Sequence, residues 1–195
     1  MECVLCGKSF SKSSVILDAI PYKHFRVISR QHTCNTQQML RIEVKGDNGR
    51  SKFLPRLYRD YPVLHVLSDS EILVCVDNEN FLVSGHTMRM IYPGFSVHKA
   101  SVVSNHIVLF GIREDEQCSR LAAFNRSKLS TPIFDDKFDG IYHVRPMLGN
   151  LARYVTFDYT VNGKTANVGD SDIKHTKRVV EFDLVTMIEG SLTSW

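Results

Sequence analysis

The chain has 195 residues, of which 43% are apolar and 23% charged, and its formal net charge at pH 7 is +3. This composition excludes a disordered protein, and the length suffices for one globular domain or for one domain with a small module. No apolar run approaches the roughly 18 residues of a membrane helix, no apolar signal core stands at the beginning, and the five cysteines fit a reducing compartment. We therefore expect an intracellular protein, cytoplasmic or nuclear, that does not bind membranes.

The charge is distributed unevenly along the chain. Residues 1–60 contain eleven Lys and Arg against five Asp and Glu, whereas residues 61–195 contain thirteen against sixteen. The two segments thus carry +6 and −3, which sum to +3. A basic segment is compatible with an anionic partner, nucleic acid above all, and also with an ordinary solvated face. We expect a basic N-terminal module over residues 1–60 and a β-rich domain over residues 61–195.

The chain opens on a Cys-x-x-Cys turn formed by Cys3 and Cys6, followed by Gly7 and Lys8. This spacing lets two thiolates converge on one tetrahedral Zn²⁺. The alternatives are two ordinary cysteines, or a redox motif, which the lack of a surrounding βαβ pattern disfavours. We expect a structural zinc ion, because four protein ligands leave no open position for water or substrate.

Cys3, Cys6 and Phe10 resemble the start of a zinc finger that holds its metal with a cysteine pair and a histidine pair. The resemblance covers residues 3–16 and ends at Ala19, which stands where that family has its first histidine. It therefore implies neither the fold nor the DNA-reading helix of that family.

Two further ligands are needed to close a zinc site of this kind. His32 and Cys34 are two positions apart, so in an extended strand both side chains face the same side. We predict that Cys3, Cys6, His32 and Cys34 bind the metal, with His24 as a substitute.

Cations and aromatic residues are interleaved through the first 60 residues. Such a mixture suits a groove in which bases stack on rings while phosphates pair with cations. Aromatic residues of a small module more often form its core, which is the competing interpretation. The candidate nucleic-acid-binding residues are Lys8, Lys12, Lys23, Arg26, Arg30, Arg50 and Lys52.

Period-2 patterning dominates from about residue 39 and predicts antiparallel strands. In residues 40–45 the apolar side chains share one face and the charged side chains the other, as in a half-buried strand. Residues 46–49 supply turn chemistry, and Pro55 predicts an edge strand or an irregular strand over residues 52–58. The remaining predicted strands are residues 71–76, 81–84, 106–112, 120–125, 153–161 and 178–185.

Little of the chain carries a helical pattern. Short helical turns are expected at residues 36–39 and 148–153, and an acidic turn between two sheets at residues 135–140. Cys75 and Cys118 stand in or beside apolar strands, where cysteine usually acts as a small core residue.

These elements predict an all-β protein, or a β-dominated α+β protein, built of antiparallel meander sheets with a small N-terminal zinc-knuckle module. The regular turn spacing favours a β-sandwich or barrel. Spacings of the strand groups also fall in the range of propeller blades, so the alternative is a small propeller, or a partial one completed by another chain.

No P-loop, dinucleotide-binding, nucleophile-elbow or zinc-protease motif occurs, and the eight histidines are scattered. Three functions remain, in order of preference. The first is a non-enzymatic, zinc-stabilised adaptor that binds a protein partner. The second is a nucleic-acid-binding protein that uses the basic N-terminal third, and the third is a hydrolase with an unrecognised His/Asp site.

Overall fold

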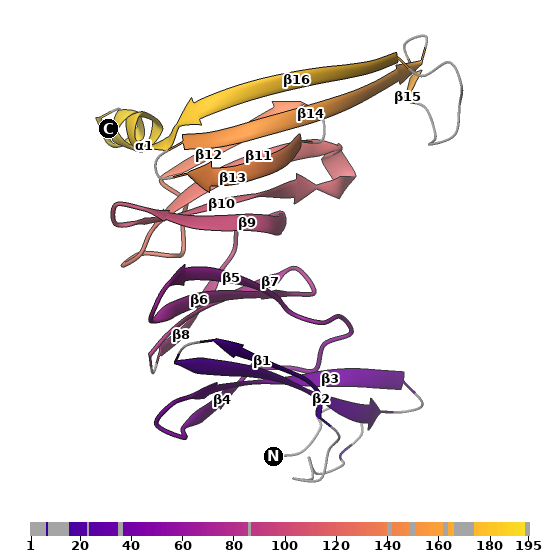
Figure 1. The fold of residues 1–195 in the computed structure, drawn as a ribbon, viewed down its shortest axis with the longest axis vertical. Coiled ribbons are helices and arrows are strands. Elements are labelled where there is room, and N and C mark those ends of the chain that lie inside the picture. Colours follow the sequence, from indigo (N-terminus) through magenta and orange to yellow (C-terminus); the bar gives the residue numbers. More distant parts are fainter. Residues whose placement is uncertain are drawn as a thin grey trace. The chain divides into compact units, whose positions relative to one another are not determined.

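The computed structural model describes Gly7 and residues 16–22, 24–34, 37–85, 87–139, 142–148, 151–161, 164–165 and 174–193. Within these residues the strands form four antiparallel sheets of four strands each (Figure 1). The chain divides into two compact units, residues 1–90 and 91–195. The boundary expected between residues 60 and 61 falls inside the first unit, between its two sheets.

The first unit contains the first two sheets, and strand order in each follows the chain. These are meanders, in which each strand turns back and pairs with the next. The first sheet comprises β1 (Ile16–Tyr22), β2 (Phe25–Cys34), β3 (Gln37–Gly46) and β4 (Ser51–Phe53). The second comprises β5 (Val63–Ser68), β6 (Glu71–Val76), β7 (Glu79–Ser84) and β8 (Thr87–Ile91), with the unit boundary at the end of β8.

The second unit contains the other two sheets. One is again a meander in chain order, formed by β9 (Ser96–Val103), β10 (His106–Arg113), β11 (Cys118–Asn125) and β12 (Phe134–Asp139), with a 3-10 turn, η1 (Glu114–Glu116), before β11. The last sheet comprises β13 (Tyr142–Leu148), β14 (Leu151–Val161), β15 (Lys164–Thr165) and β16 (Lys174–Asp183). In this sheet β14 pairs with each of the other three strands. The helix α1 (Leu184–Thr193) follows β16 directly.

The core of the first unit lies between its two sheets. Apolar residues alternate along β2 and β3, and the inward set meets the alternate residues of β6 and β7. The predicted inward face of residues 40–45 is therefore confirmed. Each of these side chains contributes about 1.5–3 kcal/mol by leaving water. The buried members are Phe25, Val27, Leu40, Ile42, Val44, Leu54, Tyr58, Ile72, Val74, Val76, Phe81 and Val83.

Tyr58 joins the two sheets of the first unit. Its backbone forms an isolated bridge with Leu40, and its ring is fully buried edge-on to Phe81, with the centroids 6.4 Å apart. The phenol donates a hydrogen bond to Glu79 Oε2 at 2.9 Å. Arg56 Nε forms an ion pair with Glu79 Oε1 at 3.0 Å. Burial and this hydrogen bond both raise the pKa of Tyr58. β4 is the end strand of its sheet and stops at Phe53, and Tyr58 adds only an isolated bridge. The expectation of an edge or irregular strand over residues 52–58 is therefore confirmed.

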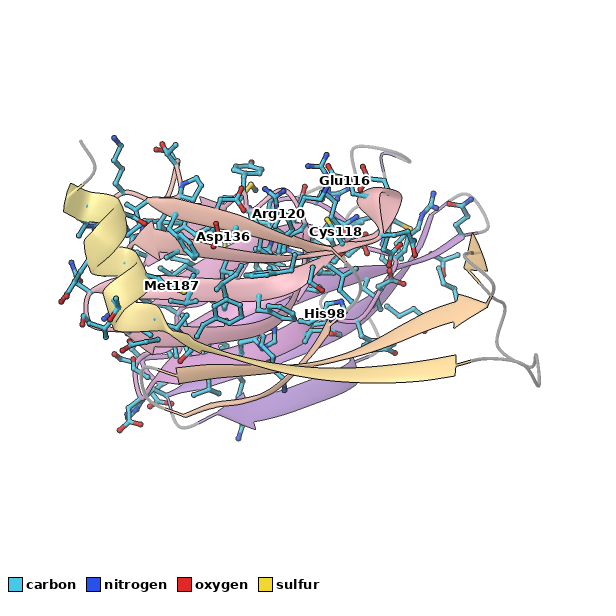
Figure 2. All side chains as sticks on the ribbon, turned by 90° about the horizontal axis from the view of Figure 1, so that it is seen from above. His98, Glu116, Cys118, Arg120, Asp136 and Met187 are labelled. Atoms are coloured by element: carbon cyan, nitrogen blue, oxygen red, sulfur yellow. The ribbon has the colours of Figure 1, made fainter. Side chains whose placement is uncertain are left out.

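The core of the second unit lies between the meander sheet and α1. Leu184 and Ile188 of α1 are buried against apolar residues of β9, β10 and β11. The Phe138 and Phe182 rings contact each other in a tilted arrangement, with an interplanar angle of 59° and centroids 4.9 Å apart. Figure 2 shows the helix across the ends of the strands, with Met187 on it. None of the helices in the described ranges is long and apolar enough to cross a membrane.

Four expectations about local structure are wrong. Residues 37–39 belong to β3 and residues 151–153 to β14, so no helical turn forms there, because ladder pairing overrides weak local propensity. The acidic segment 135–139 lies in β12 rather than in a turn. The last strand ends at Asp183, and a helix begins at Leu184.

Candidate functional site

The charged side of the first sheet is defined by the pairing of β2 and β3. These strands pair without a register shift, and residues between the core positions face away from the core. Arg26 and Arg30 of β2 consequently lie directly opposite Lys45 and Arg41 of β3, respectively. We call these four side chains, with Glu43 between them, the outer cationic face.

Glu43 lies at the centre of the outer cationic face and is 7% exposed. Its carboxylate accepts a hydrogen bond from Arg30 Nε at 3.0 Å. Burial opposes its ionisation, but hydrogen bonds from Ser51 and Arg30, and the charges of Arg30 and Lys45, hold the pKa of Glu43 below its ordinary value. Like charges directly opposite each other destabilise a sheet, and one carboxylate offsets only part of this repulsion. The face therefore favours an additional anion.

Arg41 adds a flat surface to this face. Its guanidinium lies over the ring of Phe53, 3.7 Å from the centroid. Burial lowers the pKa of Arg41, the Glu43 charge opposes this shift, and the nearby Arg30 charge adds to it. A guanidinium stacked on an aromatic ring presents a plane on which a nucleobase can stack.

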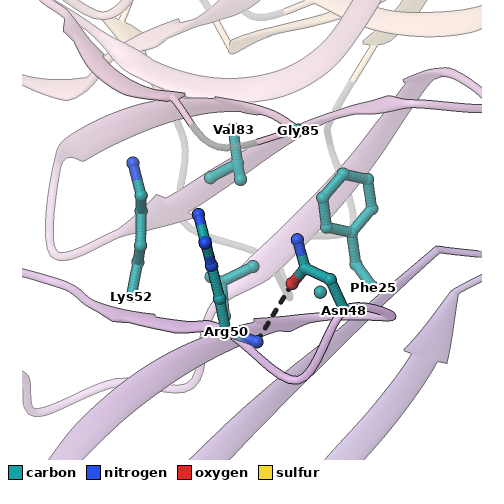
Figure 3. A pocket seen from close by; sticks show the side chains of 8 residues that line it. Phe25, Asn48, Arg50, Lys52, Val83 and Gly85 are labelled. Carbon is teal, nitrogen blue, oxygen red and sulfur yellow. Dashed lines mark hydrogen bonds between the residues drawn. The ribbon is translucent and has the colours of Figure 1, made fainter.

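A small pocket lies on the other side of the same sheet, at the end where the β3–β4 hairpin meets the turn after β7 (Figure 3). It encloses about 290 Å³ of space that includes open solvent. Its wall is apolar, formed by Phe25, Val44 and Val83. We call it the hairpin pocket.

The rim of the hairpin pocket is cationic. Arg50 and Lys52 rise from the hairpin on the same side as Asn48, and Figure 3 shows all three side chains directed toward the strand that carries Val83. The side-chain oxygen Oδ1 of Asn48 accepts a hydrogen bond from the Arg50 backbone N–H at 3.0 Å, which stabilises the hairpin turn. None of the described residues that line the pocket is acidic. Two cationic side chains therefore line the pocket beside its apolar wall.

The structure divides the predicted nucleic-acid-binding residues between these two places. Arg26 and Arg30 lie on the outer cationic face, and Arg50 and Lys52 lie at the hairpin pocket. Sequence reasoning missed Arg41 and Lys45, although the period-2 pattern had placed both on the polar side of their strand. The missing information was the register between β2 and β3. The predicted residues Lys8, Lys12 and Lys23 lie outside the described residues.

The predicted zinc ligands are only partly within the described residues. Cys3 and Cys6 lie outside them, whereas β2 includes both His32 and Cys34 in one extended run. His24 sits at the turn before β2, where its Nδ1 lies 2.8 Å from Asp47 Oδ2. In the described ranges no three His, Cys, Asp or Glu side chains are placed to hold a metal.

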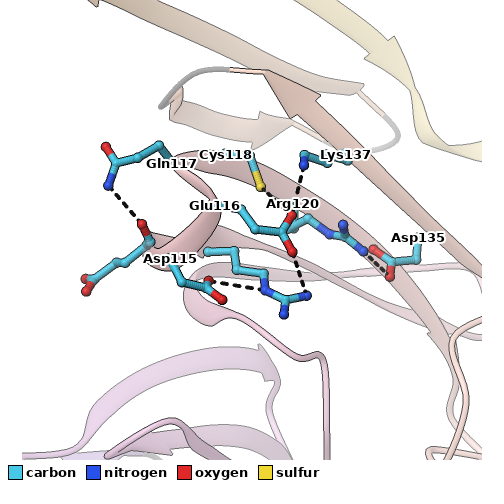
Figure 4. A network of polar contacts seen from close by, with 9 residues as sticks. Asp115, Glu116, Gln117, Cys118, Arg120, Asp135 and Lys137 are labelled. Atoms are coloured by element: carbon cyan, nitrogen blue, oxygen red, sulfur yellow. Dashed lines mark hydrogen bonds and ion pairs between the residues drawn. The ribbon is translucent and has the colours of Figure 1, made fainter. Parts of the chain in front are cut away.

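A network of ion pairs occupies one edge of the second unit (Figure 4). Arg113 contacts Asp115 and Glu116, and Lys137 Nζ lies 2.9 Å from the second carboxylate oxygen of Glu116. The hydrogen bond from Lys137 is the largest of the interactions that lower the pKa of Glu116. Arg120 pairs with Asp135 in the same region. Positive and negative groups balance each other, so we interpret this network as structural.

The two described free thiols are poor nucleophiles. Cys75 and Cys118 are both buried, as expected of core cysteines. Burial raises the pKa of Cys75 to about 12, and burial together with the neighbouring Glu116 raises the pKa of Cys118. A thiol reacts as the thiolate, so neither group is activated for covalent chemistry.

No protein-family model matches the sequence, and no curated protein is significantly similar to it. Among solved structures, the β-propeller domain of the Trilobed protease from Pyrococcus furiosus, described as having an open velcro topology, is similar to this chain with a TM-score of 0.53. The two sequences are 8% identical, and the superposition covers 85% of this chain and 54% of the other.

This chain thus spans about half the length of that propeller chain. At 8% identity the likeness concerns the fold alone. Four-stranded antiparallel meanders are the repeating unit of propellers. The antiparallel meander architecture expected from the sequence is therefore confirmed, with a propeller as its structural neighbour.

Proposed function

We propose that this protein is a non-enzymatic adaptor, a propeller-like array of blades that binds a partner protein and whose N-terminus is tied by zinc. The observation that carries the proposal is an apolar edge. β5 is the end strand of its sheet and pairs only with β6 among the described strands. Tyr61, Val63 and Val66, in or just before β5, are 53%, 54% and 50% exposed.

An exposed apolar edge strand is a template for pairing with another chain. The partner that fits is an extended segment with apolar side chains, since its backbone completes the open ladder of β5 while its side chains cover Val63 and Val66. No Lys or Pro lies within β5 to oppose such pairing.

The test compares proteins retained from a lysate by the wild-type chain and by the variant Val63→Lys/Val66→Lys. Both positions are exposed, so the variant is expected to fold. A matched control is Tyr92→Lys, which also places a charge at an exposed apolar site, in the second unit. Proteins lost by the double variant and kept by the control support the proposal. Equal retention by all three chains overturns it.

A second candidate function, nucleic-acid binding, is favoured by the outer cationic face. Four cations surround one carboxylate there, and the stacked Arg41–Phe53 pair supplies a plane for a base. If all four cations neutralise phosphates, the logarithm of affinity for a single strand falls with the logarithm of salt concentration with a slope of about −3.

This function is tested by the fluorescence anisotropy of a labelled single-stranded RNA across a salt series. The variant Arg26→Gln/Lys45→Gln is expected to weaken binding and to reduce the slope by about 1.4. The charge-matched variant Arg50→Gln/Lys52→Gln serves as the control. Equal effects of the two variants would show that total charge, rather than this face, governs binding.

A further inference from the structure

We infer that the partner at the edge of β5 is a second copy of this chain, paired with the first in an antiparallel register centred on Leu64. The inference rests on the proposed adaptor function and names the occupant of the same edge. Since β5 is the end strand of a four-stranded sheet, the two sheets join edge to edge.

The edge of β5 is self-complementary. Two antiparallel strands of identical sequence are related by a two-fold axis, so each copy offers the donors and acceptors that complete the ladder of the other. A lone extended segment added to β5 leaves its own outer edge unpaired, which repeats the problem that it solves. The β5 strand of a second copy is already paired with β6 on its far side. Both open edges are therefore closed at once.

The charge along the edge also favours a second copy. Residues 61–68 contain no Lys, Arg, Asp or Glu, so self-pairing sets no like charges opposite each other within the strand. Charged residues stand at the two ends, with Arg59 exposed before the strand and Asp69 exposed after it. An antiparallel pair brings the beginning of each strand beside the end of the other. A cation and an anion therefore meet twice in one dimer.

Symmetry and charge together select the register. Residues opposite each other in an antiparallel pair point to the same face of the sheet, so a two-fold axis allows only registers that pair residues an even number of positions apart. Among these, the register centred on Leu64 brings Arg59 nearest to Asp69. The exposed Val66 of each copy then lies opposite Pro62 of the other, which covers it with an apolar ring.

The ladder is short, which limits the affinity. Pro62 has no N–H to donate, so the regular pairing in this register comprises residues 63–65 of each copy. An interface of this length falls below the about 1,200 Å² that a stable complex buries. We therefore expect a weak dimer, with a Kd between about 10 µM and 1 mM.

The first experiment measures the mass of the purified full-length protein by sedimentation equilibrium up to about 1 mM. The wild type is expected to change from monomer to dimer over this range. Val63→Lys/Val66→Lys should remain monomeric, because self-pairing then brings four added cations together. Tyr92→Lys, which charges an exposed apolar site of the second unit, should keep the Kd of the wild type.

A charge exchange tests the register. Arg59→Asp and Asp69→Arg are each expected to raise the Kd by about tenfold, because either change turns two attractive contacts per dimer into repulsive ones. The combined variant Arg59→Asp/Asp69→Arg restores opposite charges and should return the Kd to within about threefold of the wild type. Both positions are exposed, so the variants are expected to fold.

A wild type that stays monomeric at every concentration overturns the inference. So does a dimer that survives Val63→Lys/Val66→Lys, or a charge exchange that fails to restore association. Capture of lysate proteins is measured independently of self-association. A monomeric wild type that still retains proteins lost by the double variant would refute the second copy as occupant and support the adaptor function, so the two failures are distinguishable.

Discussion

Single residues in the first unit show how two paired strands tolerate like charges that face each other. Arg26 faces Lys45 and Arg30 faces Arg41. Each pair places two like charges directly opposite each other, which destabilises the sheet. Glu43 lies between them with its pKa held low by the hydrogen bonds and charges around it, against the effect of burial. The carboxylate is thus a structural counter-ion for the face on which the second candidate function depends.

Replacing Glu43 by Gln is expected to destabilise the protein at pH 7 by about 1–2 kcal/mol, because charge-assisted hydrogen bonds to Arg30 and Ser51 are weakened. A carboxyl group whose pKa is lower in the folded than in the unfolded chain stabilises fully above the unfolded value of about 4.5, and this contribution is lost as the pH falls through the folded pKa. The difference in stability between wild type and variant should therefore shrink as the pH falls below about 4.5. Urea unfolding at pH 7 and pH 3 measures it.

The control for this prediction is Glu114→Gln, an exposed carboxylate of the second unit. It should change stability by less than about 0.5 kcal/mol at either pH. A Glu43 variant whose destabilisation does not shrink at all between pH 7 and pH 3 would contradict the assigned role, because protons compete with the ionic contribution below the unfolded pKa.

At the scale of elements, close approach between strands decides which residues are allowed. β10 pairs with β9 on one side and β11 on the other, and the register with β9 shifts between Phe110 and Gly111. A side chain at Gly111 would overlap the backbone carbonyl of Ser96 and the ring of Phe95. The glycine is therefore a steric requirement of this strand pair.

Substituting Gly111 by Ala is expected to destabilise the second unit by about 2–3 kcal/mol, because the Ser96 backbone must move. The same substitution at Gly190 makes a strict control. That residue lies in the interior of α1 with nothing within 4 Å of an added side chain, so Ala should stabilise by about 0.5–1 kcal/mol. Thermal unfolding of both variants measures the opposite signs. If Gly111→Ala does not lower the unfolding temperature, the strand pair accommodates the methyl group and the prediction is wrong.

At the scale of the whole molecule, the sequence predicts the sheets better than it predicts their grouping. The alternation of Leu40, Ile42 and Val44 with charged neighbours correctly indicated a half-buried strand, because that signal is local. The pairing of Arg30 with Arg41 depends on register, which the sequence does not express. Asp135 and Asp136 suggested a turn, yet pairing of β12 with β11 makes them part of a strand.

The same limit applies to the candidate site. Arg50 and Lys52 were found from composition, but their separation from Arg26 and Arg30 follows from the hairpin, which turns alternate residues to opposite faces. Val44 lies opposite Lys52 in the ladder, which puts this cation on the apolar side of the sheet. Only tertiary structure distinguishes a rim of a pocket from a solvated face.

The zinc proposal makes a prediction that involves both units. Protein purified without a metal-affinity tag is expected to contain about one zinc ion per chain, because Cys3 and Cys6 need only His32 and Cys34 to complete a tetrahedral set. Metal binding couples to folding, so a chelator should speed amide exchange near His32, at the end of β2.

The start of β2 should behave differently on chelation. Phe25 and Val27 are buried in the core of the first unit, so their amides should stay protected without the metal. Residues 91–195 form a separate compact unit and should exchange as before. Cys6→Ser should reproduce the effect of the chelator, whereas Cys75→Ala should not remove zinc. Metal-free protein whose exchange is unaltered by added zinc would contradict the proposed ligand set, because the end of β2 would then be held by the sheet alone.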